Sequence, residues 1–188
     1  MRCLIAGKDS EIAREIHLRL LKDGWEVDAT TGHSMMVPRG KWDLLILAHG
    51  QLAPIGKFFE CNAQEWLGAM MVNCVFPLAC LRAAWPERNA GSTVVFIGGP
   101  NMMRPSPTYS AYRAGKAVLE TLTGTLEAEY PGHKFKVLHP GIVNTRIHQQ
   151  TLAAGHKAAN YERVMKIVNG TEPSTGHDEV YMRLKALL

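Results

Sequence analysis

The chain has 188 residues, of which 46% are hydrophobic and 20% are charged, and its formal net charge is +4. This length and composition are sufficient for one domain with a sizeable core, and they exclude a disordered tail. The basic residues are scattered, which argues against binding to nucleic acid or to a membrane surface, and uninterrupted apolar runs such as residues 44–48 are too short to span a bilayer.

Apolar segments alternate with amphipathic segments along the chain. Residues 3–6 form a short apolar run, residues 25–30 alternate apolar with polar side chains, and residues 44–48 are apolar throughout, which predicts three strands. The other predicted elements are strands at 93–97 and 136–139 and helices at 11–22, 64–85, 110–130 and over most of 148–188. Pro77 predicts a kink in its helix, and residues 170–176 are expected to form a loop.

The order of strand and helix is typical of an α/β fold with a parallel sheet that is covered by helices on both faces. We therefore expect a Rossmann-like, doubly wound parallel sheet in one domain that spans residues 1–188. Ligands of such sheets bind at the carboxyl ends of the strands, near the point where the strand order reverses. The turns that follow Ala6, Ala48, Ile97 and His139 are therefore the candidate site.

A tyrosine and a lysine lie four residues apart at the start of the helix predicted at 110–130. This spacing places Tyr112 and Lys116 on one face of the helix. An ammonium beside a phenol stabilises the phenolate and lowers the phenol pKa, so the pair can act as an acid–base device. The same spacing recurs at 130/134 and 181/185, and a solvated contact on a helix surface is the alternative for any such pair. Only Tyr112 follows a buried strand and a glycine-rich loop.

The order of the motifs resembles that of the short-chain dehydrogenase/reductase family over nearly the whole chain. Gly50 follows the strand at 44–48, Asn73 lies within the helix at 64–85, and residues 91–145 combine a strand, a loop, the YxxxK helix and a PGxVxT motif. The resemblance implies an NAD(P)(H)-dependent oxidoreductase that interconverts the carbonyl and alcohol forms of a small-molecule substrate by hydride transfer.

The resemblance also implies roles for individual residues. Tyr112 would be the general acid/base, Lys116 would lower its pKa and bind the nicotinamide ribose, and Asn73 would hold a water in a proton relay. The implied cofactor-binding residues are Tyr112 and Lys116 together with Gly7, Asp9, Ser10, Ile12, Thr31, Ala48, Gly50, Pro140, Gly141, Val143 and Thr145. Residues 1–50 would be the dinucleotide-binding part, 64–145 the catalytic part and 146–188 a helical segment over the substrate, and helices 64–85 and 110–130 would form a homodimer.

The phosphate-binding turn departs from the family pattern TGxxxGxG. Residues 6–13 read AGKDSEIA, and Glu11 places an anionic side chain where backbone should approach a pyrophosphate. One unit charge at about 5 Å costs roughly 3 kcal/mol at an effective dielectric constant of about 20. Two interpretations stay open. Either Glu11 turns outward and Lys8 offsets its charge, or Asp9 or Ser10 caps the helix, Glu11 complements the helix dipole, and the turn binds no phosphate.

A second departure concerns the active-site serine, whose position is taken by Gly99. Losing such a hydrogen-bond donor can cost about 10²–10³-fold in rate. A water, Asn101, Ser106 or Thr108 could replace it. Glu11 and Gly99 together motivate an alternative function, a catalytically impaired relative that binds a nucleotide or a protein partner.

A third departure is length. Residues 31–43 leave room for a loop only, and the chain stops soon after residues 178–180, so we expect five strands, without the third and last strands of the family and with 25–30 and 136–139 as edges. No carboxylate follows the second strand, and Arg39 and Lys41 lie nearby, which favours NADP over NAD. The residues in that region are Thr30, Thr31, Gly32 and His33.

The remaining reactive residues predict no further chemistry. The eight histidines show no HxxxH or HExxH spacing, so no metal site is expected, although His49 could border the adenosine. The four cysteines show no CxxC, and no signal peptide precedes the first apolar run, which favours free thiols and a cytoplasmic location. Four methionines could line an apolar substrate pocket, with plain packing as the alternative: Met35, Met36, Met102 and Met103.

Overall fold

A computed structural model describes residues 1–32, 35–99 and 104–188 of the chain. Its five strands are all parallel and form one sheet in the order β2-β1-β3-β4-β5, so β2 and β5 are the edges, as predicted. The strands are β1 (Arg2–Ala6), β2 (Glu26–Thr30), β3 (Trp42–Leu47), β4 (Arg88–Ile97) and β5 (Lys134–Leu138). The strand order reverses at β1, between β2 and β3, which places a ligand site at the ends of β1 and β3.

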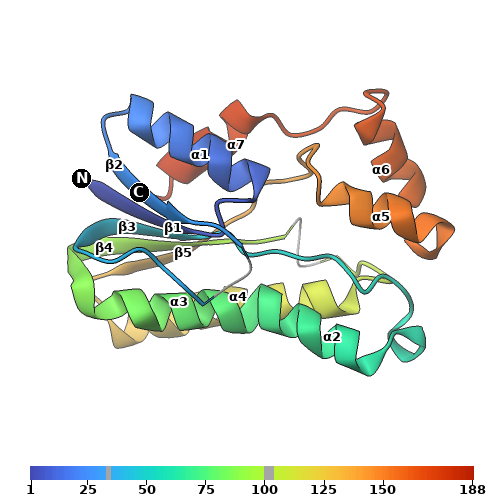
Figure 1. Cartoon of the computed structure of the whole chain (residues 1–188), viewed down its shortest axis with the longest axis horizontal. Coiled ribbons are helices and arrows are strands. Elements are labelled where there is room, and N and C mark those ends of the chain that lie inside the picture. Colours follow the sequence, from blue (N-terminus) through green and yellow to red (C-terminus); the bar gives the residue numbers. More distant parts are fainter. Residues whose placement is uncertain (33–34, 100–103) are drawn as a thin grey trace.

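Helices cover both faces of the sheet (Figure 1). One face carries α1 (Glu11–Lys22) and α7 (His177–Lys185), and the other carries α3 (Phe76–Ala84) and α4 (Ser110–Glu129). Three shorter helices lie toward the carboxyl ends of the strands: α2 (Ala63–Met70), α5 (His148–Ala154) and α6 (Tyr161–Val168). The doubly wound α/β fold is therefore confirmed.

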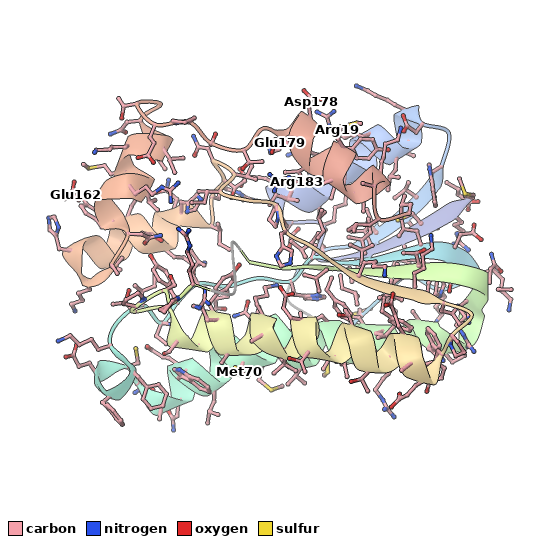
Figure 2. All side chains as sticks on the ribbon, turned by 180° about the vertical axis from the view of Figure 1, so that it is seen from behind. Arg19, Met70, Glu162, Asp178, Glu179 and Arg183 are labelled. Atoms are coloured by element: carbon pink, nitrogen blue, oxygen red, sulfur yellow. The ribbon has the colours of Figure 1, made fainter. Side chains whose placement is uncertain are left out.

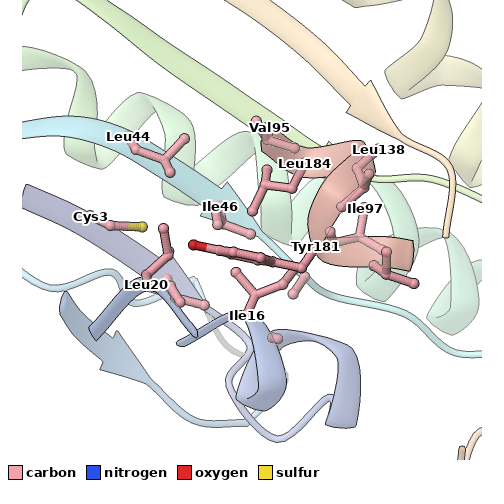
Figure 3. Packing of buried hydrophobic residues seen from close by; sticks show 14 of the residues in the cluster. Cys3, Ile16, Leu20, Leu44, Ile46, Val95, Ile97, Leu138, Tyr181 and Leu184 are labelled. Carbon is pink, nitrogen blue, oxygen red and sulfur yellow. The ribbon is translucent and has the colours of Figure 1, made fainter. Parts of the chain in front are cut away.

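The core on the first face is built around Tyr181 of α7. Its ring lies between Ile16 and Leu20 of α1 and the apolar residues of the sheet (Figure 3). Its hydroxyl donates to Asp23 Oδ2 at 3.0 Å, and burial together with that carboxylate raises the Tyr181 pKa to about 12. An ion pair of Arg19 with Asp178 joins the same two helices at the surface (Figure 2). This second YxxxK tyrosine is therefore a structural residue of the core.

The helix predicted at 64–85 is interrupted by a π-helical turn at Met71–Val75, which separates α2 from α3. Pro77 closely follows the π-turn, and the residues before it are helical too, so its missing backbone N–H removes one helical hydrogen bond at this place. The break therefore precedes Pro77, because the extra residue of the π-turn shifts the helical hydrogen bonds there. The predicted helix 11–22 is confirmed without change, while β4 and β5 begin earlier than expected.

The helical stretch Ala63–Glu87 is also long and apolar enough, by length and composition, to cross a membrane, with a hydropathy of 1.6 over its most apolar window. The uninterrupted apolar runs considered in the sequence did not reveal this property. In the structure 44% of that window is buried, and α2 and the π-turn pack against α4. A buried core helix passes the same test, so this finding is weak support for a membrane span.

Candidate functional site

A cavity of about 450 Å³ opens at the carboxyl ends of the strands, between the turn after β1, the start of α4 and the helices α5 and α6. Tyr112 and Lys116 line it, and so do all the other predicted cofactor-binding residues except Thr31, which is exposed. Those that line it are Gly7, Asp9, Ser10, Ile12, Ala48, Gly50, Pro140, Gly141, Val143 and Thr145. The structure therefore brings together residues that lie far apart in the sequence.

Tyr112 and Lys116 lie one turn apart on α4, and both side chains are buried. Lys116 Nζ donates to the carbonyl oxygens of His49 and Ile97, each at 2.7 Å, and lies 6.0 Å from the centre of the Tyr112 ring. Burial lowers the Lys116 pKa to about 7 and raises the Tyr112 pKa well above its ordinary value, against a smaller lowering by Arg113. In this arrangement burial outweighs the attraction to a neighbouring cation in the Tyr112 pKa.

Asn73 is fully buried within the π-turn and lies behind the cavity rather than in its wall. Its Nδ2 donates to Gln51 O at 2.8 Å and to Ala69 O at 2.9 Å, and its Oδ1 accepts from Gln51 N at 2.9 Å. The amide therefore fixes the loop after β3, next to the His49 carbonyl that holds Lys116. A Cβ at Gly115 would lie 2.6 Å from Asn73 Cβ, so only glycine lets α4 approach the π-turn this closely.

The turn after β1 keeps the first glycine of a phosphate-binding loop. Gly7 has a φ of +87°, and a Cβ there would lie 3.1 Å from the backbone of Ala48, so this position requires glycine. Ser10 occupies the N-cap position of α1, but its side chain makes no capping hydrogen bond. Asp9 Oδ2 instead accepts from Gly32 N at 2.5 Å. A carboxylate is thus present at the end of β2 after all, supplied by the β1–α1 turn.

Glu11 spans from the start of α1 to the segment after β5. Its Oε2 accepts from Arg146 N at 2.5 Å, and its Oε1 lies 3.7 Å from Arg146 Nε, while Arg146 Nη2 donates to Asp9 O at 2.8 Å. The carboxylate therefore points toward Arg146, and it neither turns fully to solvent nor only complements the dipole of its own helix. It ties together the two segments that flank the position where a pyrophosphate is expected.

The helices α5 and α6 are held over the site by side chains that the sequence analysis did not identify. Gln150 Oε1 accepts from Leu52 N at 2.9 Å and from Ala53 N at 2.8 Å. The Tyr109 hydroxyl lies 3.0 Å from Thr151 Oγ1 and also hydrogen-bonds Asn160. No motif marks these residues, because their partners are backbone groups or residues far away along the chain.

The residues that could replace the missing serine lie in different places in the structure. Thr108 Oγ1 accepts from Ala159 N at 3.0 Å and donates to Pro107 O, so it holds the start of α6. Ser106 lines the cavity. Asn101 lies outside the described residues, as do His33, Met102 and Met103. Met35 and Met36 are exposed and do not line the cavity.

Two further histidines line the cavity. His49 follows β3 and is buried. His148 Nε2 lies 3.0 Å from Val143 O, and because a carbonyl oxygen only accepts, Nε2 carries the proton. Burial lowers the His148 pKa. Among the described residues, no three His, Cys, Asp or Glu side chains are grouped in a way that could hold a metal ion.

The sequence profile of a family described as short chain dehydrogenase matches residues 31–155, a segment that contains Asn73, Tyr112, Lys116 and the PGxVxT motif. The chain belongs to the short-chain dehydrogenase family. The matched segment begins after the β1–α1 turn, so it does not include Glu11 or the degenerate glycine pattern.

Similarity to individual proteins supports this assignment. An uncharacterized oxidoreductase of Schizosaccharomyces pombe is 30% identical over 107 residues, which cover 56% of this chain and 43% of that protein. A short-chain type dehydrogenase/reductase of Picea abies is 30% identical over 117 residues, which cover 57% and 43%. The chain thus spans less than half the length of these relatives. The crystal structure of the KRED1-Pglu enzyme superposes with a TM-score of 0.84 over 99% of this chain and 93% of that chain at 15% identity, which shows a shared fold.

Proposed function

We propose that this member of a family of oxidoreductases interconverts a carbonyl and an alcohol with NAD(P)(H), and that Tyr112 is its general acid/base. The observation that carries the proposal is the burial of Tyr112 and Lys116 in the wall of a cavity at the strand ends. A buried acid–base pair in a cavity of this kind is a common mark of an active site.

The residues of the cavity fit a dinucleotide at its nicotinamide end. Gly50 lies beside Lys116, since a Cβ built on it would lie 4.0 Å from Nζ, and Gly141 and Val143 also line the cavity. Lys116 would hold the ribose, and the PGxVxT segment would border the nicotinamide, which when bound supplies or accepts the hydride. At the diphosphate position the Glu11–Arg146 contact must open, or Arg146 must offset the added negative charge.

The chain itself supplies the proton and its control. In the direction of reduction, the Tyr112 hydroxyl donates its proton to the substrate oxygen, and in oxidation it accepts that proton as phenolate. Because burial raises the Tyr112 pKa more than Arg113 lowers it, the phenolate needs a further cation, and Lys116 Nζ, 6.0 Å from the centre of the Tyr112 ring, would supply it as an ammonium. Asn73 contributes by fixing the loop that carries the His49 carbonyl, a partner of Lys116 Nζ.

The proposal is tested by titrating the protein with NADH and NADPH and recording nicotinamide fluorescence and melting temperature. Both dinucleotides are required, because the Asp9 carboxylate at the end of β2 weakens the sequence argument for NADP. We expect one of them to bind and to support reduction of simple aldehydes or ketones. The absence of any response at millimolar concentrations of both would contradict the proposal.

A second candidate function is binding without turnover. The Glu11–Arg146 contact favours it, because it places a carboxylate at the expected diphosphate position, and Gly99 favours it, because it offers no hydroxyl to the substrate. A dinucleotide or nucleotide that binds without reduction of any carbonyl, and with equal affinity to Tyr112→Phe, would favour this function.

A homodimer through the two long helical segments remains part of the proposal. Four apolar side chains on these segments are 40% to 61% exposed: Leu67, Met71, Val75 and Val118. A dimer through these helices would cover these side chains, as apolar surface is covered in protein interfaces. Light scattering after size-exclusion chromatography measures the mass directly, and a monomer at micromolar concentrations would contradict a stable dimer.

A further inference from the structure

The side-chain amide of Gln150 has a fixed orientation at the wall of the cavity. Its oxygen accepts two backbone N–H groups, from Leu52 at 2.9 Å and Ala53 at 2.8 Å. Only the oxygen of an amide can accept, so this pair of donors defines which end is Nε2. Within the described part of the chain Nε2 has no hydrogen-bond partner, and Gln150 lines the same cavity as Tyr112.

Reduction of a carbonyl needs a second hydrogen-bond donor on the substrate oxygen. As the carbon accepts a hydride, the π electron pair of the C=O bond moves to the oxygen, which becomes negative until it takes the Tyr112 proton. A fixed donor lowers the energy of this state, and in the family pattern a serine at position 99 supplies it. Gly99 has no side chain, and the Thr108 hydroxyl is occupied by Pro107 and Ala159.

We propose that Gln150 Nε2 donates this hydrogen bond to the substrate oxygen, and that the substrate is an aldehyde or ketone with apolar flanking groups; the inference rests on the proposed function. The donor is preorganised because two backbone groups already hold the amide oxygen. Apolar groups for the flanking parts of a substrate come from Leu52, Tyr109 and Ile147, which also line the cavity, and Leu52 packs in one cluster with Tyr112. Gln150 gains and loses no proton in the reaction.

The test compares Gln150→Glu with the wild-type protein. Glutamate keeps oxygen atoms for the Leu52 and Ala53 N–H groups but lacks the donor. We expect kcat for 4-nitrobenzaldehyde, measured with NADH and NADPH, to fall about 10²-fold with a smaller change in KM. The neutral variant Gln150→Met should lose rate as well. Gln149→Glu is the matched control, because Gln149 is exposed and its substitution introduces the same charge next to Gln150. Melting temperatures show whether each variant is folded.

Binding of an unreactive carbonyl compound gives a readout that does not depend on turnover. Benzamide should shift the ¹⁵N–¹H signal of the Gln150 side-chain amide, and it should bind at least tenfold more weakly to Gln150→Glu than to wild type. Equal rates and equal benzamide affinities in the folded variants would overturn the inference and leave the proposed function intact. A loss in Ser106→Ala without a loss in Gln150→Glu would do the same and assign the donor to Ser106. A wild-type protein that neither reduces the aldehyde nor binds benzamide would overturn both proposals.

Discussion

The charge of Glu11 should control how tightly the chain binds a dinucleotide. Glu11→Gln keeps a side-chain oxygen to accept from Arg146 N but removes the negative charge beside the expected diphosphate. A unit charge at about 5 Å contributes roughly 3 kcal/mol at an effective dielectric constant of about 20. The Glu11 side chain is 35% exposed and Arg146 lies beside it, so solvent and the guanidinium screen most of this energy. We expect about 1 kcal/mol, or roughly a fivefold tighter Kd.

The assay is a fluorescence or calorimetric titration with NADH and NADPH, together with reduced nicotinamide riboside, which carries no phosphate. Glu15→Gln is the matched control, since Glu15 lies one turn further along α1, pairs with Arg19, is 39% exposed and does not line the cavity. Only Glu11→Gln should tighten dinucleotide binding, and neither variant should change binding of the riboside. An unchanged or weaker dinucleotide affinity in Glu11→Gln, or an equal gain in Glu15→Gln, would refute the electrostatic argument.

Three further variants test the catalytic part of the site. Tyr112→Phe should reduce turnover at least about 10²-fold while dinucleotide binding in the same titration persists. Gly115→Ala should lower the free energy of unfolding by about 1–3 kcal/mol in denaturant titrations, because its Cβ would lie 2.6 Å from Asn73 Cβ, whereas Gly124→Ala, with nothing within 4 Å, should not. The Lys116 pKa is about 7 in the folded protein, against 10.5 ordinarily. Between these two pH values the lysine is therefore protonated in the unfolded state and largely neutral in the folded state. Stability measured without cofactor should therefore rise between pH 7 and 10, by at most about 1.4 kcal/mol per pH unit, and Lys116→Met should lack this rise.

The elements that were predicted correctly are those whose signal is local. Helix 11–22 has a clear apolar stripe, and the buried strands are short apolar runs, so both followed from periodicity. The π-turn at Met71–Val75 did not follow from periodicity, because it arises where the Asn73 side chain hydrogen-bonds Gln51 and Ala69. A π-turn of this kind depends on tertiary contacts. Pro77 predicts an irregularity in this helix, but no residue pattern marks that the register of hydrogen bonds changes over Met71–Val75 before it.

The candidate site divides in the same way. Motif spacing predicted that Tyr112 and Lys116 share one helix, and the strand ends located the glycines that line the same cavity. The residues that hold α5 and α6 over the cavity were missed, because Gln150 finds its partners 97 and 98 positions away and Tyr109 reaches Asn160 at the N-cap of α6. Only a known sheet order could have suggested that the segment after β5 faces the loop after β3.

The contact of Glu11 with Arg146 shows why the glycine pattern alone does not decide whether the turn binds phosphate. A missing glycine excludes a ligand only if the new side chain fills the space with atoms that cannot move or pair. Here the carboxylate is partly exposed and lies beside Arg146, a cation on the segment after β5 that also lines the cavity. If a diphosphate enters, Arg146 can exchange one anion for another, so the cost is the difference between two ion pairs rather than the burial of an unpaired charge. Dinucleotide affinity should then fall with increasing salt concentration in the wild-type protein and fall less in Arg146→Gln, and a salt dependence identical in the two would contradict a role for Arg146 in holding the phosphates.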